Sequence, residues 1–167
     1  TSCGFTLLFE LFQIRQGGLG IGGGPIGKGF FVKLHLGMVS GEVGCLKEQV
    51  VNYLYITSSR SNSPLVIIDC FLLNDKAWDY LLNHHNSPLA QSGCTIFLKG
   101  VDVLSAEHRR QILANMLAMD ICKRNRVVFS CVCQSGESVT EAGMAFVEHL
   151  GCLVLYLPPM RQYISQI

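Results

Sequence analysis

The stretch Gly41-Glu42-Val43-Gly44-Cys45-Leu46-Lys47-Glu48 follows an apolar run and precedes a helical pattern. In phosphate-binding loops, glycines let backbone N–H groups turn toward phosphate oxygens, and a lysine neutralises the terminal phosphates. Gly41, Gly44 and Lys47 satisfy that pattern, but Leu46 stands before the lysine, where the pattern requires glycine. A Cβ at this position resists positive φ values and crowds the space of the phosphates. The stretch therefore predicts a phosphate-loop backbone with weakened phosphate affinity.

A second stretch, Gly22-Gly23-Gly24-Pro25-Ile26-Gly27-Lys28-Gly29, also fits the spacing of a phosphate loop. A working loop follows a strand and opens a helix, whose positive N-terminal end contributes to the site. The residues before Gly22 are glycine-rich, and those after Gly29 have an extended pattern. The context therefore favours a glycine-rich link here and places the candidate site at Gly41.

The composition of the 167 residues is typical of a single α/β domain, with 49% hydrophobic and 15% charged residues. A net charge of +1 gives no overall field that would favour nucleic acid or a membrane surface. The sequence contains no membrane-length apolar run, and we expect no leader segment. The eight cysteines form no Cys-x-x-Cys pair, so we expect buried free thiols in a reducing cytoplasm and no zinc site.

Five short apolar segments predict strands, at residues 31–40, 65–69, 95–98, 126–132 and 153–157. Helical stripes lie between them, around Val50, Ala77, Ile112 and Val139, and Ser105 is the expected N-cap of the third helix. This alternation indicates a parallel sheet covered on both faces, with ligands at the carboxyl ends of the strands. We expect residues 1–30 to form a short helix, which extends from Thr1 to Arg15, and a glycine-rich link. We expect residues 31–167 to form the domain.

From residue 39 onward, the chain resembles the α/β part of the AAA+ domain of bacterial sigma-54-dependent transcription activators. The resemblance rests on four blocks in the family's order, at residues 41–48, 58–70, 93–101 and 157–163. The third block, Gly93-Cys94-Thr95-Ile96-Phe97-Leu98-Lys99-Gly100-Val101, matches the family's GGTLFLDEI, and the fourth matches LPPLRER. The resemblance implies a three-layer αβα P-loop NTPase-like core with a five-stranded parallel sheet. Because the sequence stops at Ile167, we expect the lid subdomain to be absent.

The resemblance also shows where the chain departs from the family. The Asp that organises Mg²⁺ is matched by Lys99, and the neighbouring Glu that activates water is matched by Gly100. The family's sensor Asn is matched by Val132, and the arginines that reach a neighbour's γ-phosphate are matched by Gly143 and His149. These differences predict that metal-assisted hydrolysis is lost.

Other candidate residues receive structural interpretations. Asp102 could in principle replace the lost carboxylates, but we expect a loop or cap role for it. His84 and His85 are adjacent on a predicted helix, where neighbouring side chains point apart, so we expect no metal. The family's GAFTGA segment, which contacts sigma-54, has no counterpart between Cys70 and Gly93. We therefore expect no contact with sigma-54.

The main functional hypothesis is a non-catalytic AAA+ domain of a bacterial transcription regulator, acting in assembly, interdomain signalling or partner binding. It requires no cofactor or metal, and its partners are other domains of the same regulator and further copies of the chain. We expect no membrane contact and no DNA contact, since the basic clusters at Arg109-Arg110 and residues 123–126 are typical of solvated helix faces.

The alternative hypothesis is a sensor that binds a nucleotide such as ATP, or another anion, without hydrolysis. Its candidate site comprises Gly41, Glu42, Val43, Gly44, Cys45, Leu46, Lys47, Glu48 and Lys99. An anion between Lys47 and Lys99 would relieve their repulsion. Lys99 could instead form a salt bridge with Glu42 or Glu48. A slow ATPase is the third hypothesis.

Overall fold

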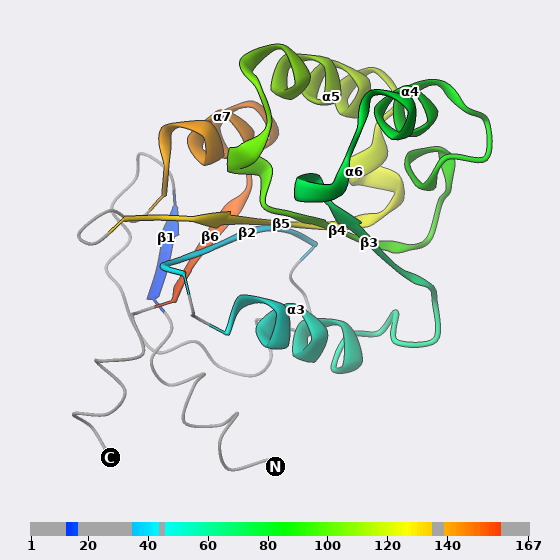
Figure 1. Ribbon diagram of the computed structural model, residues 1–167. Helices are drawn as coiled ribbons and strands as arrows, with labels where there is room; N and C mark the ends of the chain where they lie inside the picture. The colour runs from blue at the N-terminus through cyan, green and yellow to red at the C-terminus, as the bar shows by residue number, and fades with distance from the viewer. Residues whose placement is uncertain (1–12, 17–34, 44–45, 135–138, 158–167) are drawn as a thin grey trace.

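The computed structural model describes residues 13–16, 35–43, 46–134 and 139–157. These residues form a six-stranded sheet with the order β1-β6-β2-β5-β4-β3 (Figure 1). The strands are β1 Gln13–Gln16, β2 Leu36–Gly41, β3 Leu65–Asp69, β4 Thr95–Lys99, β5 Arg126–Val132 and β6 Leu153–Leu157. Strands β6, β2, β5, β4 and β3 run parallel, which confirms the predicted five-stranded parallel sheet.

The helices cover both faces of this sheet, as predicted. They are α3 Lys47–Ile56, α4 Asp75–Asn83, α5 Ala106–Ala118, α6 Ile121–Arg124 and α7 Glu141–Leu150, with short 3-10 helices η1 Cys70–Leu72, η2 Pro88–Ala90 and η3 Val101–Val103. Helix α3 lies on one face, and α4, α5, α6 and α7 lie on the other (Figure 1). None of the helices in the described part of the chain is long and apolar enough to cross a membrane.

Burial explains why the strands read as continuous apolar runs rather than alternating ones. Met38 and Phe129 pack into the larger core beneath α4, α5 and α7, whereas their neighbours Val39 and Val128 pack against α3. Successive side chains of a strand point to opposite faces, so a sheet covered on both sides needs apolar residues at both parities.

Side-chain caps fix the start of three of the four long helices. Asn74 accepts a hydrogen bond from the N–H of Ala77 at α4, and Thr140 does the same for Gly143 at α7. Ser105 accepts from the N–H of His108, which confirms the predicted cap of α5. Helix α3 begins after Leu46, which supplies no side-chain cap. Within the described residues, the N-cap position of α3 therefore provides no side-chain acceptor, unlike the N-cap positions of the other three helices.

The N-terminal segment differs from its prediction. Gln13–Gln16 is a strand, whereas the apolar spacing favoured a helix that extends to Arg15; β1 pairs antiparallel with β6, with Ile14 opposite Leu155. Pairing with a sheet edge overrides the local pattern of so short a segment. Strand β2 begins at Leu36. The glycine-rich stretch at residues 22–29, the predicted boundary near residue 30 and the motif at residues 158–163 lie outside the described residues.

Candidate functional site

The carboxyl ends of the parallel strands β2, β3, β4 and β5 lie along the same side of the sheet, which we call the carboxyl edge. The strand register places Gly41 of β2 beside Val132 of β5, and Asp69 of β3 beside Lys99 of β4. Lys47 opens α3 directly after the loop that follows β2. The structure therefore brings the sequence-predicted residues Gly41, Lys47, Glu48 and Lys99 to this edge; Gly44 and Cys45 lie outside the described residues.

Lys47 is buried, with 7% of its surface exposed, and its ammonium turns back onto the preceding loop. Lys47 Nζ donates to Glu42 O at 2.9 Å and to Gly41 O at 3.2 Å. Two of the three ammonium protons are thus directed at carbonyl oxygens of the loop in which a phosphate would be held. The ammonium of Lys47 therefore binds the backbone of the loop that precedes it.

The backbone of Leu46 does not have the positive φ that glycine accepts freely. Its φ of −84° is ordinary for an L-residue. The carbonyl of Leu46 accepts the N–H of Val50 at 3.0 Å and starts the hydrogen-bond ladder of α3. The loop therefore takes a conformation that leucine tolerates, which agrees with the resistance of a Cβ-bearing residue to positive φ.

Lys99 pairs with Glu48, one of the two carboxylates foreseen as alternatives to a bound anion. Lys99 Nζ lies 2.9 Å from Glu48 Oε1, and both side chains are partly exposed. The hydrogen bond from Lys99 lowers the pKa of Glu48, against an opposing contribution from burial. The same hydrogen bond, with the charges of Glu48 and Asp69, raises the pKa of Lys99. Both groups are consequently charged at neutral pH.

Gly100, which the resemblance matches to the water-activating glutamate, is enclosed. Its φ is +75°, and its N–H donates to both the carbonyl and the hydroxyl of Ser130 at 3.1 Å. A Cβ added at Gly100 would lie 2.6 Å from Cε2 of the Phe71 ring. A side chain at this position would therefore need a left-handed backbone and a movement of the Phe71 ring, which is 59% exposed.

Asp102 lies within η3 and caps no helix, but its carboxylate has a structural contact. Its Oδ1 accepts the N–H of Val132 at 3.2 Å, at the carboxyl end of β5. The carboxylate therefore links η3 to the strand end where the family has its sensor residue. The sequence placed both residues near the site but gave no signal that they contact each other.

The two positions matched to arginine fingers lie on α7. Gly143 is buried, and a Cβ there would approach Val139 Cγ1 to 2.8 Å and Cys131 Sγ to 3.1 Å. His149 is exposed, and its Nδ1 lies 2.7 Å from Ala145 O one turn earlier. An arginine at position 143 would therefore not fit this core, and His149 contacts its own helix.

The two adjacent histidines behave differently from their prediction. His84 ends α4, and its ring stacks on that of His85 at 4.4 Å between centroids; Tyr80 stacks on the other side of His84 at the same distance. The expectation that the rings point apart is wrong, because His84 has left the helical conformation. Among the described residues, no group of three or more His, Cys, Asp or Glu side chains could hold a metal.

The basic cluster at residues 123–126 is largely structural. Arg126 is 2% exposed, and its Nη1 donates to Leu54 O at 2.8 Å. Arg124 donates to Met119 O, Gln91 O and Ser92 Oγ. The interpretation of these two arginines as a solvated helix face is wrong, since they join the ends of α3, α5 and β5 to nearby loops.

The described cysteines are free, as the sequence predicted. Burial is the main cause that raises the pKa of Cys70 and of Cys152 to about 12, and that of Cys122 to about 11. These thiols remain protonated at neutral pH, so they have the character of core residues rather than nucleophiles.

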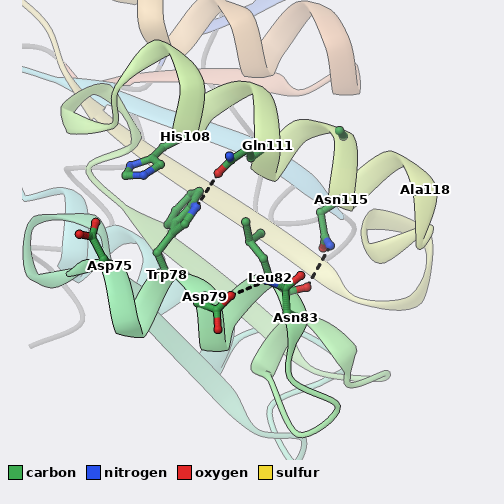
Figure 2. A pocket seen from close by; sticks show the side chains of 10 residues that line it. Asp75, Trp78, Asp79, Leu82, Asn83, His108, Gln111, Asn115 and Ala118 are labelled. Carbon is green, nitrogen blue, oxygen red and sulfur yellow. Dashed lines mark hydrogen bonds between the residues drawn. The ribbon is translucent and has the colours of Figure 1, made fainter.

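A polar groove of about 690 Å³ lies between α4 and α5, away from the carboxyl edge (Figure 2). Trp78 Nε1 donates to Gln111 Oε1 at 2.8 Å, and the Trp78 ring lies 4.4 Å from that of His108. Asn115 Nδ2 donates to Leu82 O at 3.3 Å. These contacts hold the two helices together. The residues of this groove are distributed over two separate helical stripes, so the sequence pattern gives no signal for it.

No protein-family model matches the sequence, and no curated protein matches it either. Solved structures do match the fold. NtrX from Brucella abortus in complex with ATP superposes with a TM-score of 0.63 and 18% identity, over 81% of this chain and 36% of that one. The P-loop NTPase domain of the sigma-54 transport activator from E. coli gives a TM-score of 0.52 and 12% identity, over 79% of this chain and 89% of that one.

The fold is that of the P-loop domain of sigma-54 activators. The shared feature is the five-stranded parallel sheet, and at these identities the likeness concerns the fold alone. The chain spans about a third of the length of the NtrX structures.

Proposed function

We propose that this chain is a non-catalytic, sigma-54-activator-like AAA+ domain of a cytoplasmic bacterial transcription regulator, which acts in assembly, interdomain signalling or partner binding. The observation that carries the proposal is the ion pair between Lys99 and Glu48 at the end of β4. An ammonium repels a divalent cation at the position where the family places its metal-organising carboxylate.

The enclosure of Gly100 supports the same proposal. Activation of an attacking water requires a base within hydrogen-bond reach of that water. Position 100 has no side chain, and a Cβ there would meet the partly exposed ring of Phe71 at 2.6 Å. In a working phosphate loop, the lysine neutralises the terminal phosphates. Here Lys47 instead donates to Gly41 O and Glu42 O.

A second candidate function is a nucleotide or anion sensor that binds without hydrolysis. Helix α3 is ten residues long, begins without a side-chain cap and carries Lys47 at its first position. The N-terminus of a helix attracts anions through its N–H groups and dipole. NtrX, which shares the fold, has been solved with ATP and with ADP. A bound phosphate would have to displace Lys47 Nζ from the two carbonyls of the loop.

Calorimetric titration with ATP, with and without Mg²⁺, combined with a phosphate-release assay separates these functions. The proposed function expects neither binding nor turnover. Metal-independent binding that Lys47→Ala abolishes would favour the sensor instead. Mg²⁺-dependent turnover abolished by Lys47→Ala would overturn the non-catalytic proposal. Lys76→Ala, which alters an exposed lysine on α4, is the matched control and leaves each of these results unchanged.

A further inference from the structure

The groove between α4 and α5 has the size of a small-molecule site. Its volume of about 690 Å³ lies within the range of about 300–1,000 Å³ that ligand pockets have. Figure 2 shows Asp75, Trp78 and Asp79 on the α4 wall, and His108 and Gln111 on the α5 wall. None of the residues that line the groove belongs to the candidate phosphate loop. A ligand bound here would therefore be distinct from one bound at the carboxyl edge.

The groove carries negative charge. Asp75 and Asp79 line it with two exposed carboxylates, and no lysine or arginine is among the lining residues that the structure describes. Neither carboxylate forms an ion pair within the described ranges. The two residues stand at positions i and i+4 of α4, where side chains are neighbours and like charges destabilise the helix. The helix dipole stabilises Asp75 in the first turn but not Asp79 in the second, so a cation between them would relieve the repulsion.

The indole and amide donors of the groove already engage acceptors of the protein. Trp78 Nε1 donates to Gln111 Oε1 at 2.8 Å, and Asn83 Nδ2 donates to Asp79 Oδ1 at 2.7 Å. Gln111 Nε2 donates in turn to Glu107 Oε1 at 3.5 Å. A ligand that offers only acceptors would therefore find few donors in this groove.

The amide of Asn115 adds an acceptor at one end of the groove. Its Nδ2 donates to Leu82 O at 3.3 Å, and this contact fixes the orientation of the amide, because only an N–H can donate to a carbonyl. Asn115 Oδ1 is buried and has no hydrogen-bond partner. A buried acceptor without a donor is unfavourable. The groove thus combines negative charge with free acceptors, which fits a cation that carries several N–H donors.

We propose that this groove binds a small organic cation with a guanidinium or primary ammonium group, whose charge is held by Asp75 and Asp79. Both groups present a positive charge and several N–H donors. Both also bind favourably beside aromatic rings, and the rings of Trp78 and His108, 4.4 Å apart, line the same groove. Free polyamines carry this chemistry, and so do the arginine and lysine side chains of other proteins; the test below distinguishes these sources.

The single tryptophan of the chain, Trp78, lines the groove, so its fluorescence reports binding directly. Agmatine, which carries a guanidinium and an ammonium, should change this fluorescence in a saturable manner. Butylurea, a neutral analogue of the guanidinium end, should not. N-acetyl-arginine amide separates the two sources: binding as tight as that of agmatine would assign the groove to an arginine side chain of a partner, and weaker binding would assign it to a free dication. These titrations contain no nucleotide, so their outcome is independent of the test of the proposed function.

Charge-removing variants test the two carboxylates. Asp75→Asn and Asp79→Asn should each raise the dissociation constant of agmatine about fivefold, the effect of one unit charge at about 4 Å in water. Glu148→Gln is the matched control: it removes an exposed carboxylate from α7, outside the groove, and should leave the constant unchanged. The absence of a saturable response to agmatine, an equal response to butylurea, or equal effects of the control and the two aspartate variants would each overturn the proposal.

Discussion

Glu48 and Lys99 form an ion pair between the first turn of α3 and the end of β4, with Nζ 2.9 Å from Oε1. In a P-loop NTPase this space lies between the phosphate loop and the metal-organising strand. In this protein, the ammonium of Lys99 and the carboxylate of Glu48 pair with each other in that space.

Lys99→Met should raise the pKa of Glu48, because its largest pKa-lowering contact is removed. The lowered pKa of Glu48 adds stability above its ordinary value of 4.5, and that stability is lost as the pH falls through the lowered pKa. The raised pKa of Lys99 adds stability below its ordinary value of 10.5, which is lost as the pH rises through the raised pKa. Since both groups are partly exposed, the pair should contribute less than about 1 kcal/mol. NMR titration of the carboxylate carbons measures the shift, and an unchanged Glu48 pKa in Lys99→Met would contradict the pairing.

Lys47→Ala should lower the free energy of unfolding by about 1–3 kcal/mol, because two carbonyls of the loop lose a charged donor. Urea denaturation followed by circular dichroism measures this change. Lys76→Ala, at an exposed position, should stay within about 0.5 kcal/mol of the wild type. Equal stability of the two variants would show that Lys47 does not hold the loop in solution.

The sequence predicted the parallel strands closely, because strands buried on both faces of a sheet are continuous apolar runs. Strands 65–69, 126–132 and 153–157 have the predicted bounds, because each is an apolar run flanked by polar or turn residues. Strand β1 was missed, since the pairing of Gln13–Gln16 with β6 is a tertiary contact that a four-residue pattern does not encode. Helix α6 was also missed; it has four residues and begins after Asp120, which has a positive φ.

The sequence predicted which residues lie near the candidate site, but it did not predict which of them contact one another. The motif placed Lys47 and Lys99 at one edge of the sheet, yet Glu42 and Glu48 remained equivalent partners for Lys99 until the geometry selected Glu48. Nothing in the sequence indicated that Phe71, which follows a different strand, lies against Gly100. Such contacts depend on how the connections after adjacent strands fold over one another.

A comparison of two glycines tests the enclosure of Gly100. Gly93 and Gly100 have nearly the same φ, +77° and +75°, but an added Cβ meets nothing within 4 Å at Gly93 and meets Phe71 at 2.6 Å at Gly100. Gly93→Ala should cost about 1–2 kcal/mol from the left-handed backbone alone. Gly100→Ala should cost about 1 kcal/mol more, from the contact with the ring. Thermal or urea unfolding measures both changes.

The double variant Phe71→Ala/Gly100→Ala separates the ring contact from the backbone strain. Removal of the Phe71 ring should restore the unfolding free energy that Gly100→Ala loses through the ring contact. The loss from the left-handed backbone, which Gly93→Ala shares, should remain. The same cycle with Gly93→Ala should show no coupling to Phe71. If Gly100→Ala costs no more than Gly93→Ala, the ring does not enclose this position in solution, and that support for lost water activation is removed.

Asp102→Ala should destabilise the chain by about 1–3 kcal/mol, because the N–H of Val132 loses its carboxylate acceptor at the end of β5. Asp102→Asn keeps an oxygen that can accept the same hydrogen bond, so it should recover most of the loss. Hydrogen exchange at the Val132 amide, measured by NMR, reports the contact directly. Faster exchange in the alanine variant than in the asparagine variant supports the hydrogen bond between Asp102 and Val132. A shift of the Asp102 carboxylate resonance of the wild-type chain on addition of Mg²⁺ would show instead that this residue is a metal ligand. Asp102 would then replace the carboxylates missing at Lys99 and Gly100, which would contradict the non-catalytic proposal.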